Sequence, residues 1–142
     1  MVTHSNAGLP RTARLLRPGE FSRVYDLRQS AASGPLVLYA APNHLEAGGV
    51  RVGLSVSRRV GGAVIRNGWK RRLREAFRAV RSGLPPGNDF VIVVRGGPAP
   101  AGAEALRQTA DAIAALAGRV VTRKGYATAR PAPAAPRPKR RR

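Results

Sequence analysis

The sequence contains no cysteine and few groups able to perform catalysis. Because cysteine is absent, the chain has no disulfide framework and no thiolate metal site. Its two histidines, His4 and His44, fall in the N-terminal segment and in a predicted loop, and its seven acidic residues are spread singly. No acids show the local spacing of a metal-dependent nuclease or of a glycosidase dyad. The sequence therefore predicts no catalytic residue and no metal ligand.

Long apolar segments are also missing. No run approaches the roughly 18 consecutive apolar residues of a membrane-spanning helix. Residues 1–6 lack the basic and then apolar regions of a signal peptide. We therefore expect a cytoplasmic protein that has no membrane partner.

Acidic residues are scarce, whereas arginine is abundant. The 142 residues include 26 basic and 7 acidic ones, which gives a formal charge of +19. Such an excess concerns the binding partner rather than the fold, and it indicates nucleic acid or another anionic surface. Hydrophobic residues make up 43% of the chain, which is enough for a core, so we do not expect a wholly disordered protein.

The most informative segment runs from Arg58 to Arg78 and carries eight basic residues and one acid. From Ile65 onward, its apolar residues recur at steps of three and four, as on one face of an α-helix. Like charges on the other face repel each other and weaken an isolated helix, so the pattern indicates a helix that a polyanion neutralises. The candidate binding residues of this segment are Arg58, Arg59, Arg66, Asn67, Lys70, Arg71 and Arg74.

The apolar pattern predicts helix, strand, strand, basic helix, strand and helix, in that order. Residues 50–57 alternate as in a half-buried strand, whereas 90–94 are continuously apolar, as in a central strand. A further strand is predicted at 36–40, and the other helices begin at Pro18 and near Leu106. We expect an α+β or α/β sandwich, with helices on a small central sheet and the basic helix forming a β-α-β crossover.

Composition divides the chain into three parts. Residues 16–117 are predicted to form one RNA-binding domain, and residues 1–15 a flexible basic segment before it. Residues 118–142 hold nine basic residues, no acidic ones and four prolines. Such a segment buries too little apolar surface to order itself, so we expect a disordered tail.

Four side chains predict a second surface. Phe21 and Tyr25 stand one turn apart on the first helix, and Val37 and Tyr39 share one face of the first strand. If this helix packs beside this strand, the four residues form an apolar trough with two phenol groups. Two interpretations stay open from the sequence: ordinary core packing, and a groove in which unpaired bases stack.

The context of the basic helix favours RNA over other anionic partners. A DNA recognition helix normally reads bases with a few polar side chains in a small helical domain, whereas this helix lies between strands and carries phosphate-type contacts. A membrane-surface helix would expose a wide apolar face, which the core needs here. We therefore expect an extended RNA surface recognised through shape and backbone, and no DNA partner.

Residues 52–78 closely resemble the signature of the bacterial ribonuclease P protein subunit. The similarity extends to Glu20–Tyr25, Leu36–Tyr39 and Asp89–Arg95 and covers roughly residues 14–118 in order. The resemblance implies a small basic subunit of an endoribonuclease, which joins a large catalytic RNA to remove the 5′ leader of precursor tRNA. It also implies that hydrolysis and the bound Mg²⁺ belong mainly to the RNA, and that the β-α-β crossover is left-handed, against the usual rule.

The resemblance also assigns roles to the basic helix. Arg66 and Asn67 match the first two positions of the family's Arg-Asn-Arg motif, and Lys70, Arg71 and Arg74 match the basic cluster that follows it. In the family these positions bind the catalytic RNA. The alternative functions are a structural RNA-binding protein, such as a ribosome-associated one, and more remotely a DNA-compacting protein.

Gly68 departs from the family motif, whose third position is arginine. The change removes a cation and places glycine inside a predicted helix, at a cost of about 1 kcal/mol relative to alanine. The family's leader-binding cleft maps onto the four trough residues. The resemblance therefore implies that the trough binds the leader of precursor tRNA.

Overall fold

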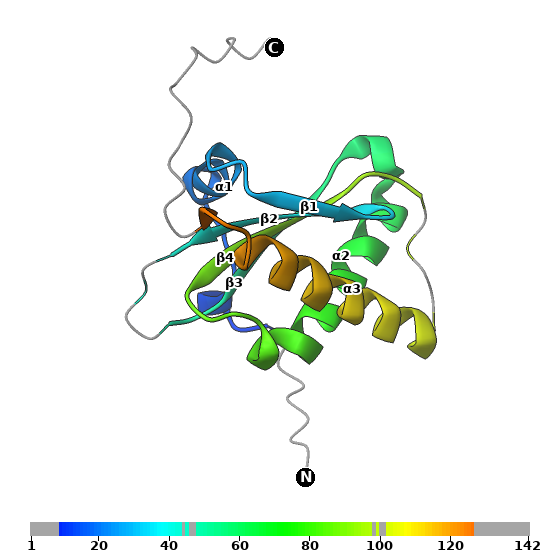
Figure 1. The fold of residues 1–142 in the computed structure, drawn as a ribbon. Helices are drawn as coiled ribbons and strands as arrows, with labels where there is room; N and C mark the ends of the chain where they lie inside the picture. The colour runs from blue at the N-terminus through cyan, green and yellow to red at the C-terminus, as the bar shows by residue number, and fades with distance from the viewer. Residues whose placement is uncertain (1–8, 44, 46–47, 98, 100–101, 127–142) are drawn as a thin grey trace, which may run out of the picture.

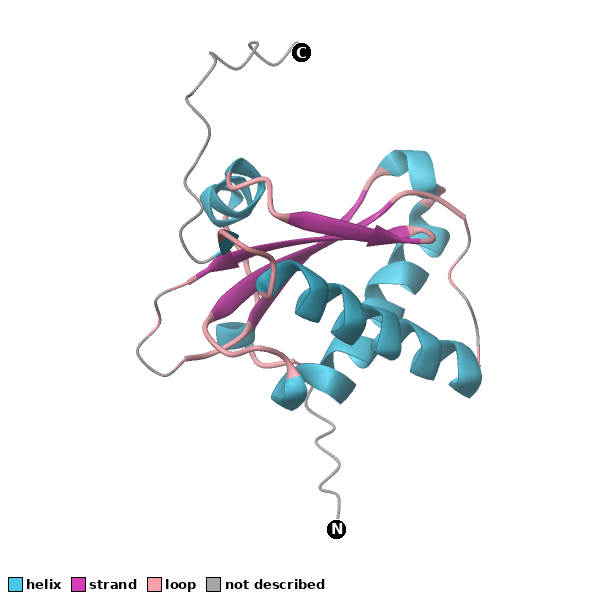
Figure 2. Cartoon of the chain, viewed as in Figure 1, coloured by secondary structure: helices cyan, strands magenta, loops and turns pink. Residues whose placement is uncertain are grey.

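The computed structural model describes residues 9–43, 45, 48–97, 99 and 102–126 (Figures 1 and 2). Three α-helices, three short 3₁₀ helices and four strands occur in these residues. In chain order they are η1 (Arg11–Ala13), α1 (Pro18–Asp26), β1 (Ser30–Ser33), β2 (Leu36–Pro42), β3 (Arg51–Val56), η2 (Arg58–Val60), α2 (Ala63–Val80), η3 (Arg81–Gly83), β4 (Asn88–Val94) and α3 (Ala103–Val121).

The four strands form one mixed sheet in the order β1-β2-β4-β3. The β1–β2 and β2–β4 pairs are antiparallel, whereas β3 and β4 are parallel neighbours joined through α2. This arrangement confirms the α+β class and the predicted crossover through the basic helix. The left-handedness of the crossover stays a prediction from the family resemblance.

The strand β1 was not predicted from the sequence. Its four residues are serine and alanine, which have little strand propensity of their own. They become a strand because they pair along β2, where Ser30 lies opposite Tyr39. Tertiary pairing therefore overrides local propensity at this edge of the sheet.

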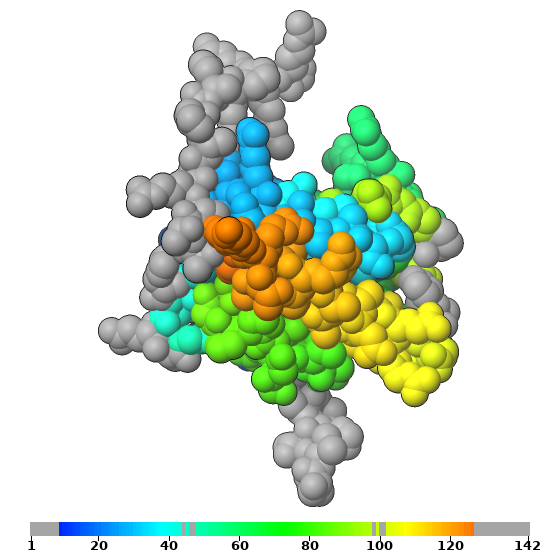
Figure 3. Space-filling model, viewed as in Figure 1, coloured from blue at the N-terminus to red at the C-terminus, as the bar shows by residue number. Residues whose placement is uncertain are grey.

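Helices cover both faces of the sheet. Alternate residues of a strand point to opposite faces, and Leu38 and Ile92 accordingly belong to the large core cluster that also contains residues of α2 and α3. Their neighbours Tyr39 and Val91 belong to a smaller cluster that contains Val24 of α1. In Figures 1 and 3, α3 crosses the near side of the sheet beside β1.

The predicted boundaries at both ends of the domain were wrong. Within the segment expected to be flexible, Leu9, Ala13 and Leu15 are buried, and Leu15 donates a backbone hydrogen bond of 2.9 Å to Val52 of the edge strand β3. These apolar residues cover β3 and part of the core, a role that the basic composition of residues 1–15 obscured. Residues 1–8 lie outside the described residues.

At the other end, the part of the expected tail that the structure describes is folded. The helix α3 continues to Val121, and Tyr126 is buried and donates a hydrogen bond to the Asn88 side chain. Burial raises the pKa of the Tyr126 phenol. The buried Tyr126 thus extends the folded domain beyond residue 118, where the composition becomes basic. The remaining tail residues, 127–142, lie outside the described residues.

A buried carboxylate, that of Asp89 at the start of β4, ties α1 to the sheet. Its oxygens accept hydrogen bonds from Arg51 Nε at 2.8 Å, Arg51 Nη2 at 2.7 Å and Asn43 Nδ2 at 3.0 Å. Arg23 of α1 forms a second ion pair with Asp89, and Arg51 also contacts Glu20 of α1 at 3.1 Å. The hydrogen bonds to Asp89 raise the pKa of Arg51. We call these five residues the Asp89 cluster.

We predict that Asp89→Asn lowers the free energy of unfolding by about 3–5 kcal/mol. The substitution removes the carboxylate that pairs with both Arg23 and Arg51, and leaves Arg51 paired with Glu20 alone. Urea denaturation measures the loss. Glu104→Gln is the matched control, because it breaks an exposed ion pair with Arg107 that is worth about 1 kcal/mol at most. Equal losses for the two variants would contradict a structural role for Asp89.

Candidate RNA interface

The core fixes the orientation of α2. The side chains of Trp69, Leu73 and Phe77 are almost completely buried, as their spacing predicted, and the indole Nε1 of Trp69 donates a 2.6 Å hydrogen bond to the Gly97 carbonyl. Ile65, in the first turn, differs from the prediction because it is 40% exposed. With the apolar side committed to the core, the opposite side of α2 faces outward.

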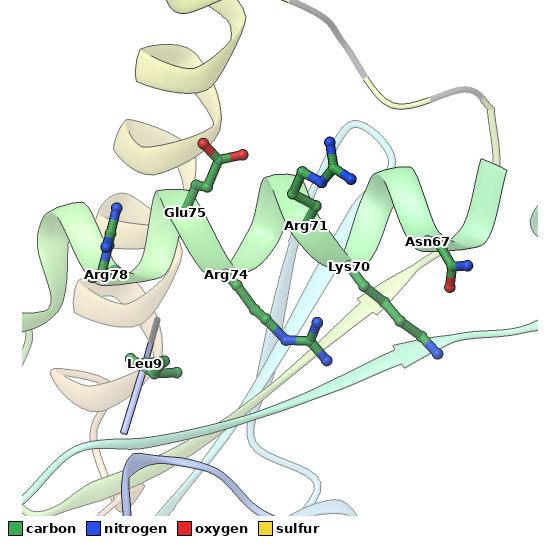
Figure 4. Close-up of a pocket in the computed structure, with 7 residues that line it drawn as sticks. All are labelled: Leu9, Asn67, Lys70, Arg71, Arg74, Glu75 and Arg78. Atoms are coloured by element: carbon green, nitrogen blue, oxygen red, sulfur yellow. The ribbon is translucent and has the colours of Figure 1, made fainter. Parts of the chain in front are cut away.

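The outward side of α2 carries a row of cations, which we call the basic face. Figure 4 shows Lys70 and Arg74 extending on one side of the helix, whereas Arg71 and Glu75 extend on the other. The row lines a pocket of about 370 Å³, to which Leu9 of the N-terminal segment also contributes. In Figure 4, Leu9 lies below the helix. The basic face consists of four cations and one asparagine, namely Asn67, Lys70, Arg71, Arg74 and Arg78, and the acidic Glu75 lines the same pocket.

Three more predicted binding residues lie where α2 begins. Arg58 and Arg59 are exposed on η2. Arg66 is half-buried, and its Nε donates a 3.2 Å hydrogen bond to the Gly61 carbonyl. The structure therefore gathers all seven predicted residues along α2 and the turn before it, although Arg66 also has a local structural contact. Gly61 allows this turn, because a Cβ there would lie 2.9 Å from the Ile65 side chain.

Three of the four trough residues, Phe21, Tyr25 and Tyr39, pack on one cluster where α1 crosses the sheet, and Val37 is not part of that cluster. The rings of Tyr25 and Tyr39 are in edge-to-face contact, with centroids 4.9 Å apart and an interplanar angle of 88°. Phe21 lies over Gly53 of β3, where a Cβ would approach the ring to 2.6 Å. Val37 shares the face of β2 with Tyr39 and is half-buried, as are the three aromatic side chains.

The trough is a partly open surface above a separate floor. The fully buried residues of this cluster are Val24, Ala41 and Val91, against which Phe21, Tyr25 and Tyr39 pack. Core packing and surface exposure therefore coexist at the aromatic residues.

Sequence reasoning missed two residues that shape the trough. Gly53 admits the Phe21 ring, and Ser55 lies close to the phenol of Tyr25. Burial raises the pKa of the Tyr25 phenol, and the neighbouring Ser55 side chain opposes the shift. The alternation of residues 50–57 places Gly53 and Ser55 on one face, but only the register of β3 beside β4 locates that face under α1.

A groove at the edge of β3 connects the two surfaces. It has a volume of about 170 Å³, and its lining includes Phe21 of the trough and Lys70 and Arg74 of the basic face. Beyond the bridge between Arg14 and Val52, the described part of the chain places no further strand on this edge. The trough and the basic face are therefore adjoining parts of one surface.

Among the described residues, side chains that could ligate a metal ion are not clustered. They contain no group of three or more histidine, aspartate or glutamate side chains that could hold one. Asp89, the most buried acid, is saturated by two arginines and an asparagine, so the chemistry of this group does not fit Mg²⁺. The same part of the chain has no helix long and apolar enough to cross a membrane.

Residues 9–118 match the family model for Ribonuclease P. The chain is 39% identical to the ribonuclease P protein component of Brevibacillus brevis over 99 residues, which cover 70% of this chain and 78% of that protein. It is also 39% identical to the component from Bordetella petrii over 110 residues, which cover 75% of this chain and 89% of the relative.

Solved structures show the same fold. The Staphylococcus aureus RNase P protein superposes with a TM-score of 0.56 at 29% identity, covering 77% of this chain and 92% of that one. The RNase P protein from Thermotoga maritima gives a TM-score of 0.51 at 30% identity, over 58% of this chain and 73% of that one.

We predict that Gly68→Ala raises the free energy of unfolding by about 1 kcal/mol, because glycine is a poor helix former. Gly68 lies within the sequence of α2 on its solvent-exposed side, and an added Cβ would meet no atom within 4 Å. Gly53→Ala is the opposing control, since its Cβ would collide with Phe21 and should lower stability. Thermal unfolding measures both, and a Gly68→Ala variant less stable than the unchanged chain would contradict the prediction.

Proposed function

The chain belongs to the Ribonuclease P protein family, and from this we propose that it binds the catalytic RNA of ribonuclease P and the 5′ leader of precursor tRNA. As a protein component of this ribonucleoprotein, it is a subunit of a tRNA-processing ribonuclease with an RNA partner. The observation that carries the proposal is the basic face, a row of cations on a helix whose other side is committed to the core.

The basic face is proposed to bind the catalytic RNA. Arg71, Arg74 and Arg78 are exposed, and Lys70 is partly exposed, so their charges can reach phosphates without unfolding the helix. Guanidinium groups suit phosphate because they donate two parallel hydrogen bonds. Arg58 and Arg59 extend the cationic surface beyond the start of α2. Binding would relieve the repulsion between these like charges, which is a reason for RNA and protein to stabilise each other.

The trough is proposed to bind the leader. Sequence-tolerant binding of single-stranded RNA commonly uses aromatic side chains on which bases stack, beside cations that contact the backbone. Tyr25 and Tyr39 provide half-buried rings, and the groove at β3 places Lys70 and Arg74 next to Phe21. A leader in the trough would therefore lie beside the catalytic RNA on α2.

Catalysis is proposed to reside in the RNA partner, with Mg²⁺ bound mainly by that RNA. The described residues contain no acidic cluster, and Asp89 is engaged in ion pairs. The contribution of this chain would be to bind leader and RNA together, which raises the affinity for substrate and lowers the repulsion between two polyanions. We propose that it acts in the cytoplasm, where precursor tRNA is processed.

If the RNA performs catalysis and the protein binds substrate, the isolated protein should not cleave precursor tRNA. Adding it to its cognate RNA should restore efficient cleavage at Mg²⁺ concentrations at which the RNA alone is slow, because the protein supplies substrate affinity. Release of the 5′ leader, followed on a gel, measures the reaction. Cleavage that persists in rigorously RNA-free protein would refute the assignment of catalysis to the RNA.

The trough predicts a selective loss of leader binding in Tyr25→Ala and Tyr39→Ala. Stacking of one base on an aromatic ring accounts for roughly 5- to 150-fold in affinity. The holoenzyme should lose about this factor for precursor tRNA, whereas its affinity for mature tRNA, which lacks the leader, should hardly change. Binding titrations with both RNAs measure the ratio, and thermal unfolding reports the stability of each variant.

The matched control for the two tyrosine variants is Val24→Ala. Val24 lies next to Tyr25 in α1, but its side chain is buried beneath the trough. It should lower the thermal midpoint, because it leaves a cavity in the core, without changing the ratio of the two affinities. If the tyrosine variants behave like Val24→Ala, the two rings are core residues and the leader binds elsewhere.

A further inference from the structure

A second pocket, of about 470 Å³, lies where α2 ends, and we call it the α2-terminal pocket. It is separate from the trough, which lies on the α1 side of the sheet. Its volume is within the usual range for small-ligand sites, roughly 300–1,000 Å³. The lining residues are Gly48, Val50, Arg78, Arg81, Ser82, Leu84 and Pro86.

Hydrogen bonds between two loops hold one wall of this pocket in place. Gly87 donates a backbone hydrogen bond of 2.8 Å to the carbonyl of Gly48, and Asn43 donates one of 2.9 Å to the carbonyl of Gly87. The Asn43 side chain also donates to Asp89 at 3.0 Å. The wall is therefore anchored to the Asp89 cluster, so a ligand would meet a preformed surface.

The chemistry of the lining matches a nucleotide. Val50 and Leu84 are buried apolar residues at the floor, which suits the faces of a nucleobase. The pocket is also lined by Arg78 and Ser82, which are exposed, and by Arg81, which is partly exposed. Guanidinium groups bind phosphate, and a hydroxyl can bond to a ribose or a base edge. Of the described residues that line the pocket, none is acidic.

We propose that the α2-terminal pocket binds one unpaired nucleotide of the catalytic RNA, an inference that rests on the function proposed above. The basic face leads directly into this pocket, because Arg78 lines both; in Figure 4 it stands at the opposite end of the row from Asn67. An RNA bound along α2 therefore reaches the pocket. The nucleotide must be unpaired, because a base inside a duplex cannot present its faces to an apolar floor.

Two full-length variants test the pocket, with the cognate ribonuclease P RNA as the probe. Ser82→Trp fills the pocket without removing a charge, and it should weaken RNA binding roughly 5- to 150-fold, the range of one base contact. Its salt dependence should not change. Arg81→Ala should weaken binding and reduce the salt slope by about 0.7–0.9. Because Ser82 is exposed, we expect thermal unfolding to show a normal midpoint for its variant.

Two reference variants make the result decisive. Arg119→Ala removes an exposed charge from α3, outside the proposed surfaces, and should bind RNA like the unchanged chain. Arg71→Ala tests the basic face. If Arg71→Ala weakens binding but Ser82→Trp and Arg81→Ala do not, the pocket proposal is overturned and the proposed function stands. If Arg71→Ala also binds normally, the proposed function fails as well.

Cross-linking identifies the RNA that occupies the pocket. A photoreactive benzophenone side chain at position 82, in the holoenzyme with precursor tRNA, should cross-link to a nucleotide that is unpaired in the catalytic RNA. Cross-links confined to precursor tRNA or to base-paired segments, or no RNA cross-link at all, would overturn the proposal.

Discussion

The Asp89 cluster is the interaction on which the rest of this structure depends. Burying a carboxylate is costly unless charges and hydrogen bonds compensate it, and Asp89 is compensated from α1, β3 and the β2–β3 loop at once. This requirement fixes α1 across the sheet, and the position of α1 brings Tyr25 onto Tyr39. The chain has seven acidic residues and a net charge of +19, and one of these acids, Asp89, forms ion pairs inside the fold.

The parallel pairing of β3 with β4 decides where the cations lie. Two parallel neighbours require a crossover, and here α2 provides it and packs its apolar side on the sheet and α3. The basic face must then point outward, where like charges remain close together. The fold therefore holds a surface that is electrostatically unfavourable alone and favourable beside a polyanion.

Much of the architecture could be predicted from periodicity. The three helices, the strands β2, β3 and β4, and the outward cations of α2 follow from the spacing of apolar residues, because burial selects one face of each element. Propensity missed β1, whose serines and alanines become a strand only through pairing with β2. Composition misplaced both ends of the domain. Leu9 and Tyr126 are buried, but one apolar side chain hardly changes the average composition of a segment rich in basic residues.

The sequence by itself determined the excess of positive charge, the one-sided cation row and the family to which the chain is similar. Tertiary structure alone decided which distant residues meet: Phe21 over Gly53, Tyr25 beside Ser55, and the groove that joins Phe21 to Lys70. It also decided that Asp89 is a structural ion-pair partner. The physical reason is that periodicity reports which face of an element is buried, whereas sheet order and register determine what that face contacts.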